Sequence, residues 1–337
     1  MNSSARQFTP LFRLRARRCS THVLLLAVLF LLAGGVAHAQ GAHVAMILSR
    51  EGRIHLEAQR GFEERLAQAS DAQVRLSVIK LDNSGALPRS YVDGQDYTLA
   101  VAVGARATEA ALRENDFAPV LSLLVPEVTI ERLTESNPDV GVGTSLDNFS
   151  AIYLDQPSDR LFSVIGKIIP EARRIGVVLG TRGLPRLFEL KPVARAHGFK
   201  LNVAVIHDPE DAAAQITDLV AESDVILAVY DPVIMNNRTA RWLLYTAFQQ
   251  RKPVIGFSQA FVRAGALASI YSTPEMIGRQ GAELLLDMIK GRGWQGGKRY
   301  YPRQFTIEFN RRLARSLRFH IPSVETLKKY YKGYVHD

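Results

Sequence analysis

Short β-branched apolar runs alternate with longer stretches of helical periodicity along most of this chain, and this alternation is the feature that most constrains its fold. Residues 44–48 form the first apolar run. Phe62, Leu66 and Ala69 then recur at helical spacing before the next run, residues 74–79. Repeated strand–helix–strand units of this kind build parallel sheets covered by helices. The sequence therefore predicts an α/β protein with doubly wound parallel sheets.

The expected strands fall into two groups, separated by a more polar segment at residues 141–159. No sequence self-similarity relates the two groups, so a tandem repeat is not indicated. Thr273, Pro274 and Glu275 have the residue types that begin a helix near the end of the chain, and Gly291 would stop it. The strands are expected at residues 44–48, 74–79, 97–103 and 119–125, then at 174–179, 200–206, 225–229 and 253–257, with two more at 265–270 and 305–309.

Residues 1–39 predict a secretory signal peptide. Four arginines between residues 13 and 18 precede an apolar run, 23–32, that is shorter than the ~20 residues of a spanning helix. A small-x-small cleavage site ends at Ala39, so cleavage is expected before Gln40, with a periplasmic mature chain. The alternatives are an uncleaved anchor or twin-arginine export. Cys19 lies before the apolar run, which argues against lipid attachment.

Composition and motifs argue against several classes of function, namely nucleic-acid binding, catalysis and metal binding. Five of the 42 basic residues and none of the 33 acidic ones lie within residues 1–39, so the rest of the chain has a formal charge of only +4. That balance gives no reason to expect nucleic-acid binding. Residues 256–260 lack the second glycine of a nucleophile elbow, the histidines are scattered, and no Gly-rich phosphate loop precedes a helix. We therefore expect no catalytic residues, no metal and no cofactor. The chain is expected to be a monomer.

Several stretches resemble a known family, the substrate-binding proteins of the uncharacterised ABC-transport type. Lys-Pro-Val-Ile-Gly-Phe-Ser at 252–258, Gly-Ala-Leu-Ala-Ser at 265–269 and Gly-Arg-Gln-Gly-Ala at 278–282 are similar to its last strands and helix. Residues 310–322 are similar to its usual ending, and the Gly61-Phe62 pair also fits. The resemblance covers essentially the whole chain after residue 39, and it is most specific between residues 252 and 322.

The resemblance implies a type I periplasmic-binding fold, in which two lobes are joined by a three-segment hinge. Crossovers are expected near Ile152, Phe257 and Gly291. Such a hinge lets two rigid lobes close around a ligand without breaking either core. The expected parts are residues 1–39 as signal peptide, 40–152 plus 258–291 as lobe 1, 153–257 plus 292–322 as lobe 2, and 323–337 as a C-terminal tail.

Ligands of open parallel sheets bind beyond the carboxyl ends of the strands, so the loops after the predicted strands are the candidate site. Asp231 matches a family position whose carboxylate faces the cleft and would suit a ligand amine or hydroxyl. The alternatives are ordinary ones: a turn or cap for Asp231 and Thr108, a solvated charge for Arg106, and hinge packing for Tyr153. The predicted ligand-binding residues are Ser49, Arg106, Thr108, Tyr153, Thr181, Tyr230, Asp231, Ser258 and Tyr271.

The chain departs from the family pattern near the expected hinge. Leu-Val-Pro-Glu at 124–127 stands where an Asp-Pro is usual, and Gly-Thr-Ser at 143–145 replaces a usual Thr-Gly. Ile-Tyr-Leu-Asp-Gln-Pro at 152–157 is also unusual. Relatives matched to aromatic amino acids are therefore poor guides to the ligand of this chain.

Two functions follow from the resemblance. The first is an extracytoplasmic solute-binding protein that captures a small polar ligand, amino-acid-like or another small metabolite, and delivers it to an ABC permease. The alternative is a periplasmic sensory or accessory protein that presents its closed form to a membrane receptor or outer-membrane system without transport. A DNA-binding repressor of the same fold is excluded by the signal peptide and by the lack of an amino-terminal helix-turn-helix.

Overall fold

The computed structural model describes residues 41–70, 72–92, 96–114, 118–136, 148–208, 210–232, 234, 236–292 and 296–334. The predicted signal peptide, the 143–145 departure and the last three residues lie outside the described residues. Within the described part the chain forms two separate six-stranded sheets, each covered by helices on both faces. The predicted α/β class with two parallel-sheet lobes is confirmed.

The first sheet has the strand order β11-β5-β4-β3-β1-β2, and all of its neighbouring strands are parallel. Its central strands are buried along their whole length, as expected for a sheet covered on both faces. The strands are β1 (Ala42–Leu48), β2 (Val74–Lys80), β3 (Leu99–Val103), β4 (Val120–Val125), β5 (Phe149–Tyr153) and β11 (Arg299–Tyr300).

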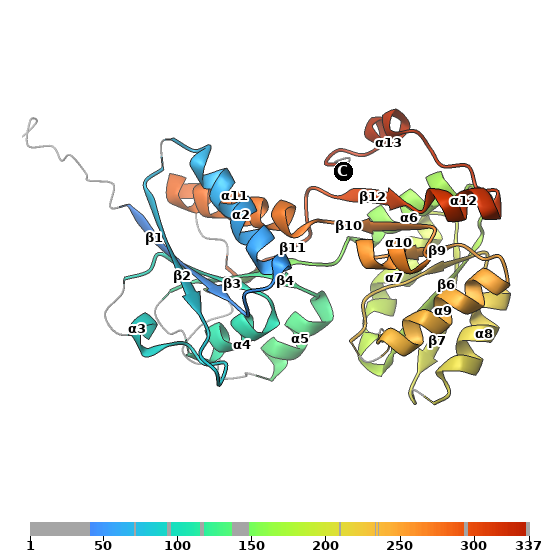
Figure 1. The fold of residues 1–337 in the computed structure, drawn as a ribbon, viewed down its shortest axis with the longest axis horizontal. Coiled ribbons are helices and arrows are strands. Elements are labelled where there is room, and N and C mark those ends of the chain that lie inside the picture. Colours follow the sequence, from blue (N-terminus) through green and yellow to red (C-terminus); the bar gives the residue numbers. More distant parts are fainter. Residues whose placement is uncertain are drawn as a thin grey trace, which may run out of the picture. The chain divides into compact units, whose positions relative to one another are not determined.

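Two helix layers cover this sheet. On one face α2 (Arg53–Ala67) lies beside α11 (Pro274–Asp287), a helix more than 200 residues later in the sequence (Figure 1). The other face is covered by α4 (Ala105–Glu114) and α5 (Glu127–Glu135), and the short α3 (Arg89–Val92) precedes β3. The first lobe is therefore completed by chain that returns from the second.

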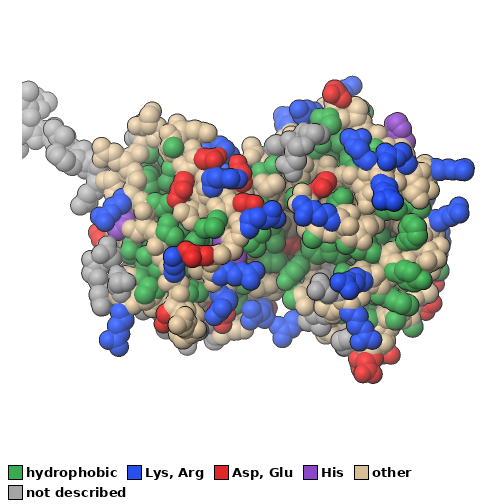
Figure 2. All heavy atoms as spheres, in the orientation of Figure 1, with side chains coloured by type: hydrophobic (Ala, Val, Ile, Leu, Met, Phe, Trp, Pro, Cys, Tyr) green, Lys and Arg blue, Asp and Glu red, His purple; other side chains and the backbone are tan. Residues whose placement is uncertain are grey.

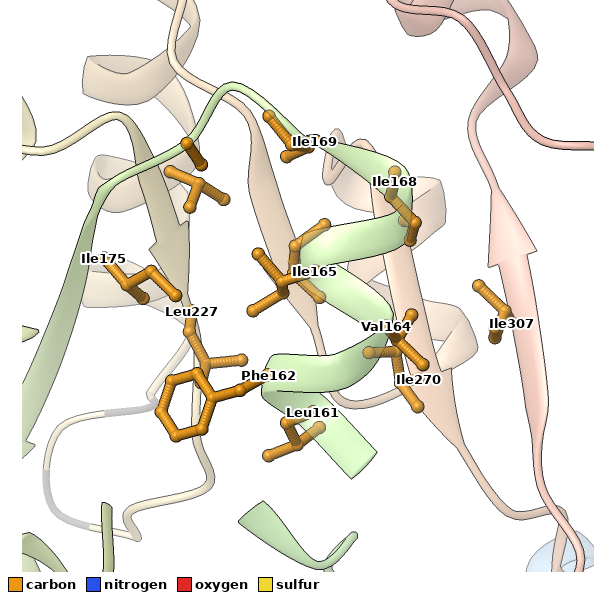
Figure 3. Close-up of a cluster of buried hydrophobic side chains, with 14 of the residues drawn as sticks. Leu161, Phe162, Val164, Ile165, Ile168, Ile169, Ile175, Leu227, Ile270 and Ile307 are labelled. Atoms are coloured by element: carbon orange, nitrogen blue, oxygen red, sulfur yellow. The ribbon is translucent and has the colours of Figure 1, made fainter. Parts of the chain in front are cut away.

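The second sheet has the order β12-β10-β9-β8-β6-β7, parallel except for β12. Its largest cluster of buried apolar residues lies under α6, whose Phe162 and Ile165 point toward Ile175 and Leu227 of the sheet (Figure 3). The strands are β6 (Arg174–Gly180), β7 (Lys200–Ile206), β8 (Val225–Leu227), β9 (Val254–Gly256), β10 (Ala268–Tyr271) and β12 (Thr306–Phe309).

Helices of the second lobe also form two layers. One layer contains α6 (Ser158–Ile168), α7 (Arg186–Ala196), α12 (Arg311–Leu317) and α13 (Val324–Tyr330). The other contains α8 (Ala212–Glu222), α9 (Asn237–Gln249) and α10 (Gln259–Ala264). A 3₁₀ turn, η3 (Thr181–Gly183), follows β6, and a π-helical turn, η4 (Met288–Arg292), ends α11.

The chain crosses between the sheets three times, after β5, after β10 and after β11. The first crossing is where the sequence predicted it, but the second follows Tyr271 and not Phe257, and the third follows Tyr300 and not Gly291. After Phe257 the chain stays in the second lobe because Phe261 of α10 packs on Gly256, where a Cβ atom would lie 2.5 Å from the Phe261 Cβ. Strand β10 then pairs with β9, so residues 258–271 belong to the second lobe.

Two strands of the first sheet were not predicted. Residues 149–153 form β5, although the surrounding segment is polar, and every residue of the strand is buried. Strand β11 has only two residues and no apolar run to reveal it. In contrast, the predicted start of the last long helix is confirmed, because Thr273 Oγ1 accepts a hydrogen bond from the Met276 N–H and Pro274 begins α11.

Candidate functional site

A pocket lies beyond the carboxyl ends of β4, β5, β8 and β9, where ligands of parallel sheets bind. Its cavity volume is about 30 Å³, or about 410 Å³ when the adjoining open solvent is counted. Its lining is mostly apolar, with a few polar side chains, which is the usual make-up of a small-molecule site. The apolar residues are Pro126, Leu154, Leu161, Ala228, Val229, Phe257 and Ile270, and the polar or amphipathic ones are Asp155, Gln156, Arg186 and Tyr230.

An irregularity at the end of β4 shapes one edge of this pocket. The register between β4 and β5 shifts between Leu123 and Val125, and Leu124 adopts a left-handed backbone conformation with φ of 60°. Such conformations are disfavoured for residues other than glycine, and bulges often redirect a chain beside a functional site. Here the shift leads Pro126 into the pocket wall and starts α5 at Glu127.

Three charged side chains from separate segments meet at the polar wall of the pocket, and we call Glu127, Asp155 and Arg186 the acidic cluster. Arg186 is only 6% exposed, and its Nη1 donates to Asp155 Oδ1 at 3.0 Å. Arg186 Nε lies 3.8 Å from Glu127 Oε2 and has no hydrogen-bond acceptor among the described residues. Asp155 Oδ2 accepts from the Glu127 N–H at 2.8 Å, and Tyr301 donates its hydroxyl to the Glu127 carboxylate.

Burial and neighbouring charge set the protonation of this cluster. Desolvation raises the pKa of Glu127 to about 7; Arg186 opposes the rise, while the charges of Asp155 and Glu189 add to it. Burial acts to lower the pKa of Arg186, but the charges of Asp155 and Glu127 outweigh it, so the pKa is raised and the guanidinium stays charged. The pKa of the Tyr230 phenol is raised by burial, then by the charges of Asp155 and Asp231.

A second polar network ties together the three segments that cross between the sheets. Gln156, in the first crossing, donates to Ser272 Oγ of the second at 2.9 Å and accepts from Arg160 Nη1. Arg160 Nη1 also donates to the Pro302 carbonyl of the third crossing at 2.9 Å. The Arg160 guanidinium lies over the Phe305 ring, and burial lowers its pKa to about 10. One side chain in the pocket wall, Gln156, is thus linked to all three segments.

Two of the predicted ligand-binding residues lie in the loop after β8. Tyr230 lines the pocket, with its ring edge-on to that of Phe257. Asp231 is 1% exposed, and its carboxylate accepts from the backbone N–H groups of Gly180 and Ile234. Asp231 therefore joins the end of β6 to its own loop, the turn role that the sequence left open as the alternative.

The predicted residues of the first lobe hold its loops. Ser49 Oγ accepts from the Ala107 N–H at the start of α4. Thr108 is fully buried, donates to the Gly104 carbonyl and is hydrogen-bonded to Ser122. Arg106 is exposed and does not line the pocket.

The remaining predicted residues are spread around the pocket without lining it. Tyr153 is buried and packs edge-on against Tyr301, and Tyr271 donates its hydroxyl to Glu308. Thr181 is exposed near His207, and Ser258 precedes α10 in a half-buried position. The pocket thus brings in Tyr230 alone of the nine predicted residues, and ligand contact by any of them stays a prediction.

The acidic cluster was not predicted as a site. Glu127 and Asp155 both stand in stretches that depart from the family pattern, 124–127 and 152–157, and this departure was the signal available in the sequence. Arg186 gave no such signal, because it lies in the first turn of a helix without a recognisable motif. Only the fold brings these side chains together from α5, the first crossing and α7.

Other kinds of site find no support in the described residues. Within them, no group of three His, Cys, Asp or Glu side chains is placed to hold a metal ion. None of the helices seen in the described part of the chain has the length and apolar character to cross a membrane. On the face drawn in Figure 2, Lys and Arg side chains are scattered among other residues and form no single stripe.

Comparison with solved structures identifies the fold as the type I periplasmic-binding fold. A ligand-free, open substrate-binding protein with adhesive properties from Clostridium difficile matches with a TM-score of 0.66 at 19% identity, covering 87% of this chain and 99% of that one. A conserved domain protein from Vibrio cholerae matches with a TM-score of 0.56 at 20% identity, covering 88% of this chain and 100% of that one. The ABC domain from Streptococcus pneumoniae in complex with L-Trp matches with a TM-score of 0.55 at 15% identity, covering 87% of this chain and 100% of that one.

Sequence comparison gives the family. No curated protein matches the chain. The family model described as ABC transporter substrate binding protein matches residues 90–322, which is more than half of the sequence and includes strands of both sheets. Proteins of this family and fold bind ligands and are generally not enzymes. The chain therefore belongs to the ABC transporter substrate-binding protein family.

Proposed function

We propose that this protein captures a small ligand in the pocket beyond β4, β5, β8 and β9, closes its two lobes around it, and delivers it in the periplasm to an ABC importer. The observation that carries the proposal is the composition of the pocket wall. Residues from both lobes and from the first crossing, including Pro126, Asp155, Arg186 and Tyr230, line one space. A ligand that touches all of them would stabilise the closed arrangement over others.

The hinge network supports closure as the response to the ligand. Gln156 lines the pocket and is hydrogen-bonded to Ser272, while Arg160 links it to the Pro302 carbonyl. A ligand that contacts Gln156 would therefore act directly on the three segments about which the lobes rotate. A neighbour of the same fold is in complex with L-Trp, but Glu127 and Asp155 lie in stretches that depart from the family pattern, so amino acids are tested beside other classes of compound.

A thermal-shift screen of amino acids, small amines, nucleobases and small carboxylates tests ligand capture in the chain from residue 40 onward. A ligand is expected to raise the melting temperature, because it binds the folded state only, and to reduce the radius of gyration measured by X-ray scattering. If no compound in any class does either, the capture function is wrong. Uptake of the labelled hit by cells with and without the gene then separates import from a sensory role.

Tyr230→Ala is expected to weaken binding of any hit roughly tenfold or more, since it removes a half-buried aromatic wall of the pocket. Phe188→Ala is the matched control, because that aromatic side chain is 88% exposed and does not line the pocket. Calorimetric titration of both variants measures the effect. Equal affinities in Tyr230→Ala and the wild type would place the ligand elsewhere.

A further inference from the structure

Negative charge outnumbers positive charge at the polar wall of the pocket. The acidic cluster contains two carboxylates, Glu127 and Asp155, but a single guanidinium, that of Arg186. Glu189, on the same helix as Arg186, adds a further negative charge that acts on Glu127. Among the described residues, no other Lys or Arg forms an ion pair with Glu127 or Asp155.

Two further arginines, Arg160 and Arg299, have partners of their own. Arg160 donates to the Gln156 side chain and to the Pro302 carbonyl, and its guanidinium covers the Phe305 ring. Arg299 covers the Phe149 ring and is hydrogen-bonded to Tyr153. When Glu127 is ionised, the wall therefore holds two carboxylate charges against one guanidinium, and buried charge is costly without a partner.

We propose that the ligand presents a cationic nitrogen to this wall, beside Asp155, and rests its apolar part against Tyr230 and Phe257. This inference rests on the proposed function, because it assigns a ligand chemistry to the same pocket. Asp155 is the carboxylate of the acidic cluster that lines the pocket, and Glu127 lies behind it, joined through its own backbone N–H. The aromatic pair of Tyr230 and Phe257 faces the same space and suits a flat or apolar body.

Binding of a cation here is coupled to a proton. Glu127 is faced by Arg186 and Glu189 from α7, by Tyr153 at the end of β5, by Asp155 after β5, and by Tyr301 after β11. Because the pKa of Glu127 is raised to about 7, this carboxyl is partly protonated at neutral pH. An ammonium ion entering the pocket favours the charged carboxylate, so the proton leaves to solvent as the ligand binds. Affinity for a cation should therefore rise with pH.

Calorimetric titration with phenethylamine, phenylacetamide and phenylacetate tests the sign of the charge, because these probes share a ring and differ in carrying a positive, no or a negative charge. At pH 8 phenethylamine is expected to bind at least tenfold more tightly than phenylacetate, with phenylacetamide between them. Its affinity should fall by up to about tenfold at pH 6, the limit set by a competing proton with a pKa near 7. Phenylacetamide affinity should change little over the same range.

Asp155→Asn keeps the shape of the side chain and removes its charge. The substitution is expected to weaken phenethylamine binding at least tenfold and phenylacetamide binding much less. Asp224→Asn is the matched control, because Asp224 also accepts from backbone N–H groups and from an Arg, Arg174, but precedes β8 at the opposite end of the sheet. Phenethylamine affinity should be unchanged in this control.

The outcomes separate this inference from the proposed function. Preference for phenylacetate or phenylacetamide over phenethylamine, or an equal loss in Asp155→Asn and Asp224→Asn, would overturn the cationic ligand but leave ligand capture standing. The phenyl probes could fail to bind while the thermal-shift screen yields a different ligand. If that ligand carries a cationic nitrogen and its affinity falls in Asp155→Asn, the inference is supported. A ligand without a cationic nitrogen overturns it. Only the complete absence of ligands and of compaction removes the proposed function itself.

Discussion

Two carboxylates that both lie near an arginine have opposite protonation behaviour in this protein. Burial opposes ionisation of Asp224, but bonds from Arg174 and from two backbone N–H groups outweigh it and lower the pKa to about 2. Among the described residues, the Glu127 carboxylate has the Tyr301 hydroxyl as donor and a long contact with Arg186, so burial dominates and the pKa rises to about 7. The number of donors that reach a carboxylate decides the outcome more than the presence of a cation nearby.

Glu127→Gln is expected to flatten the dependence of stability on pH. The folded state holds the Glu127 proton more tightly than the unfolded chain does, with a pKa of about 7 against an ordinary 4.5. The resulting stabilisation is complete below pH 4.5 and is lost as the pH rises through 7, on the order of 3 kcal/mol in total. Glutamine does not titrate, so this loss is absent from the variant.

Urea unfolding of the wild type and of Glu127→Gln at pH 5, 6, 7 and 8 measures this difference. The free energy of unfolding should fall more steeply with pH in the wild type. Glu63→Gln is the control, since that exposed carboxylate accepts a hydrogen bond from the nearby Gln59 side chain and is far from the acidic cluster in the sequence. Parallel profiles for the wild type and Glu127→Gln would show that Glu127 does not hold its proton in the folded state.

The sequence predicted which loops approach the site, but not the direction of the individual side chains in those loops. The pattern of strands correctly indicated that the loops after β8 and β9 approach a pocket, and Tyr230 is there. It could not tell that the Asp231 carboxylate turns back to the Gly180 N–H, because side-chain direction in a loop depends on packing that no local pattern encodes. Asp155 and Arg186 are 31 residues apart, and only the crossing of the chain between the sheets makes them partners.

At the scale of elements, the closest packing in the first lobe is the contact between α2 and α11. Each helix presents a glycine to the backbone of the other. A Cβ atom on Gly61 would overlap the carbonyl oxygen of Glu275, and one on Gly278 would overlap that of Ala58. The sequence singled out both glycines through the family resemblance, but their physical reason is this close approach of two backbones.

Gly278→Ala is expected to lower the free energy of unfolding by about 1–3 kcal/mol, because α11 must move away from α2 and the apolar residues beneath both helices. Gly166→Ala is the matched control in a helix of the other lobe, where the nearest atom to an added Cβ is a Phe199 ring carbon at 3.5 Å. That change should be neutral or stabilising through helix propensity, by up to about 1 kcal/mol. Equal effects of the two substitutions in chemical denaturation would contradict the proposed packing.

The sequence revealed long elements better than short ones. Every strand with a sustained apolar run was predicted, as was the capped start of α11. Strand β5 was missed because its five residues stand inside a polar segment, and β11 because two residues carry no pattern. These two strands form the far edge of the first sheet, so their absence from the prediction also misplaced the third crossing.

At the scale of the whole molecule, the two lobes are interwoven because the chain crosses three times. Sheet strands β1 to β10 are complete by Tyr271, yet the first lobe still lacks α11 and β11 at that point. Ile277 and Leu285 of α11 belong to the same buried cluster as Met46 and Leu123 of the sheet. The first lobe can therefore close its core only after most of the second lobe, β6 to β10, has been synthesised.

A fragment of residues 40–272 should consequently keep most of its secondary structure while exposing the apolar face of the first sheet and the part of the second core that β12, α12 and α13 cover. We expect it to bind the dye ANS and to unfold without a sharp transition, the behaviour of a chain with incomplete packing. A second fragment, residues 273–337, supplies α11, β11 and β12 and should suppress the dye signal when the two are mixed. The same second fragment carrying Gly278→Ala should do so less well, because α11 then cannot approach α2. Two results together would contradict this expectation: cooperative unfolding of the 40–272 fragment, and ANS fluorescence that the second fragment does not change. The first lobe would then fold without residues 273–337, and closure of interwoven lobes would lose its structural basis.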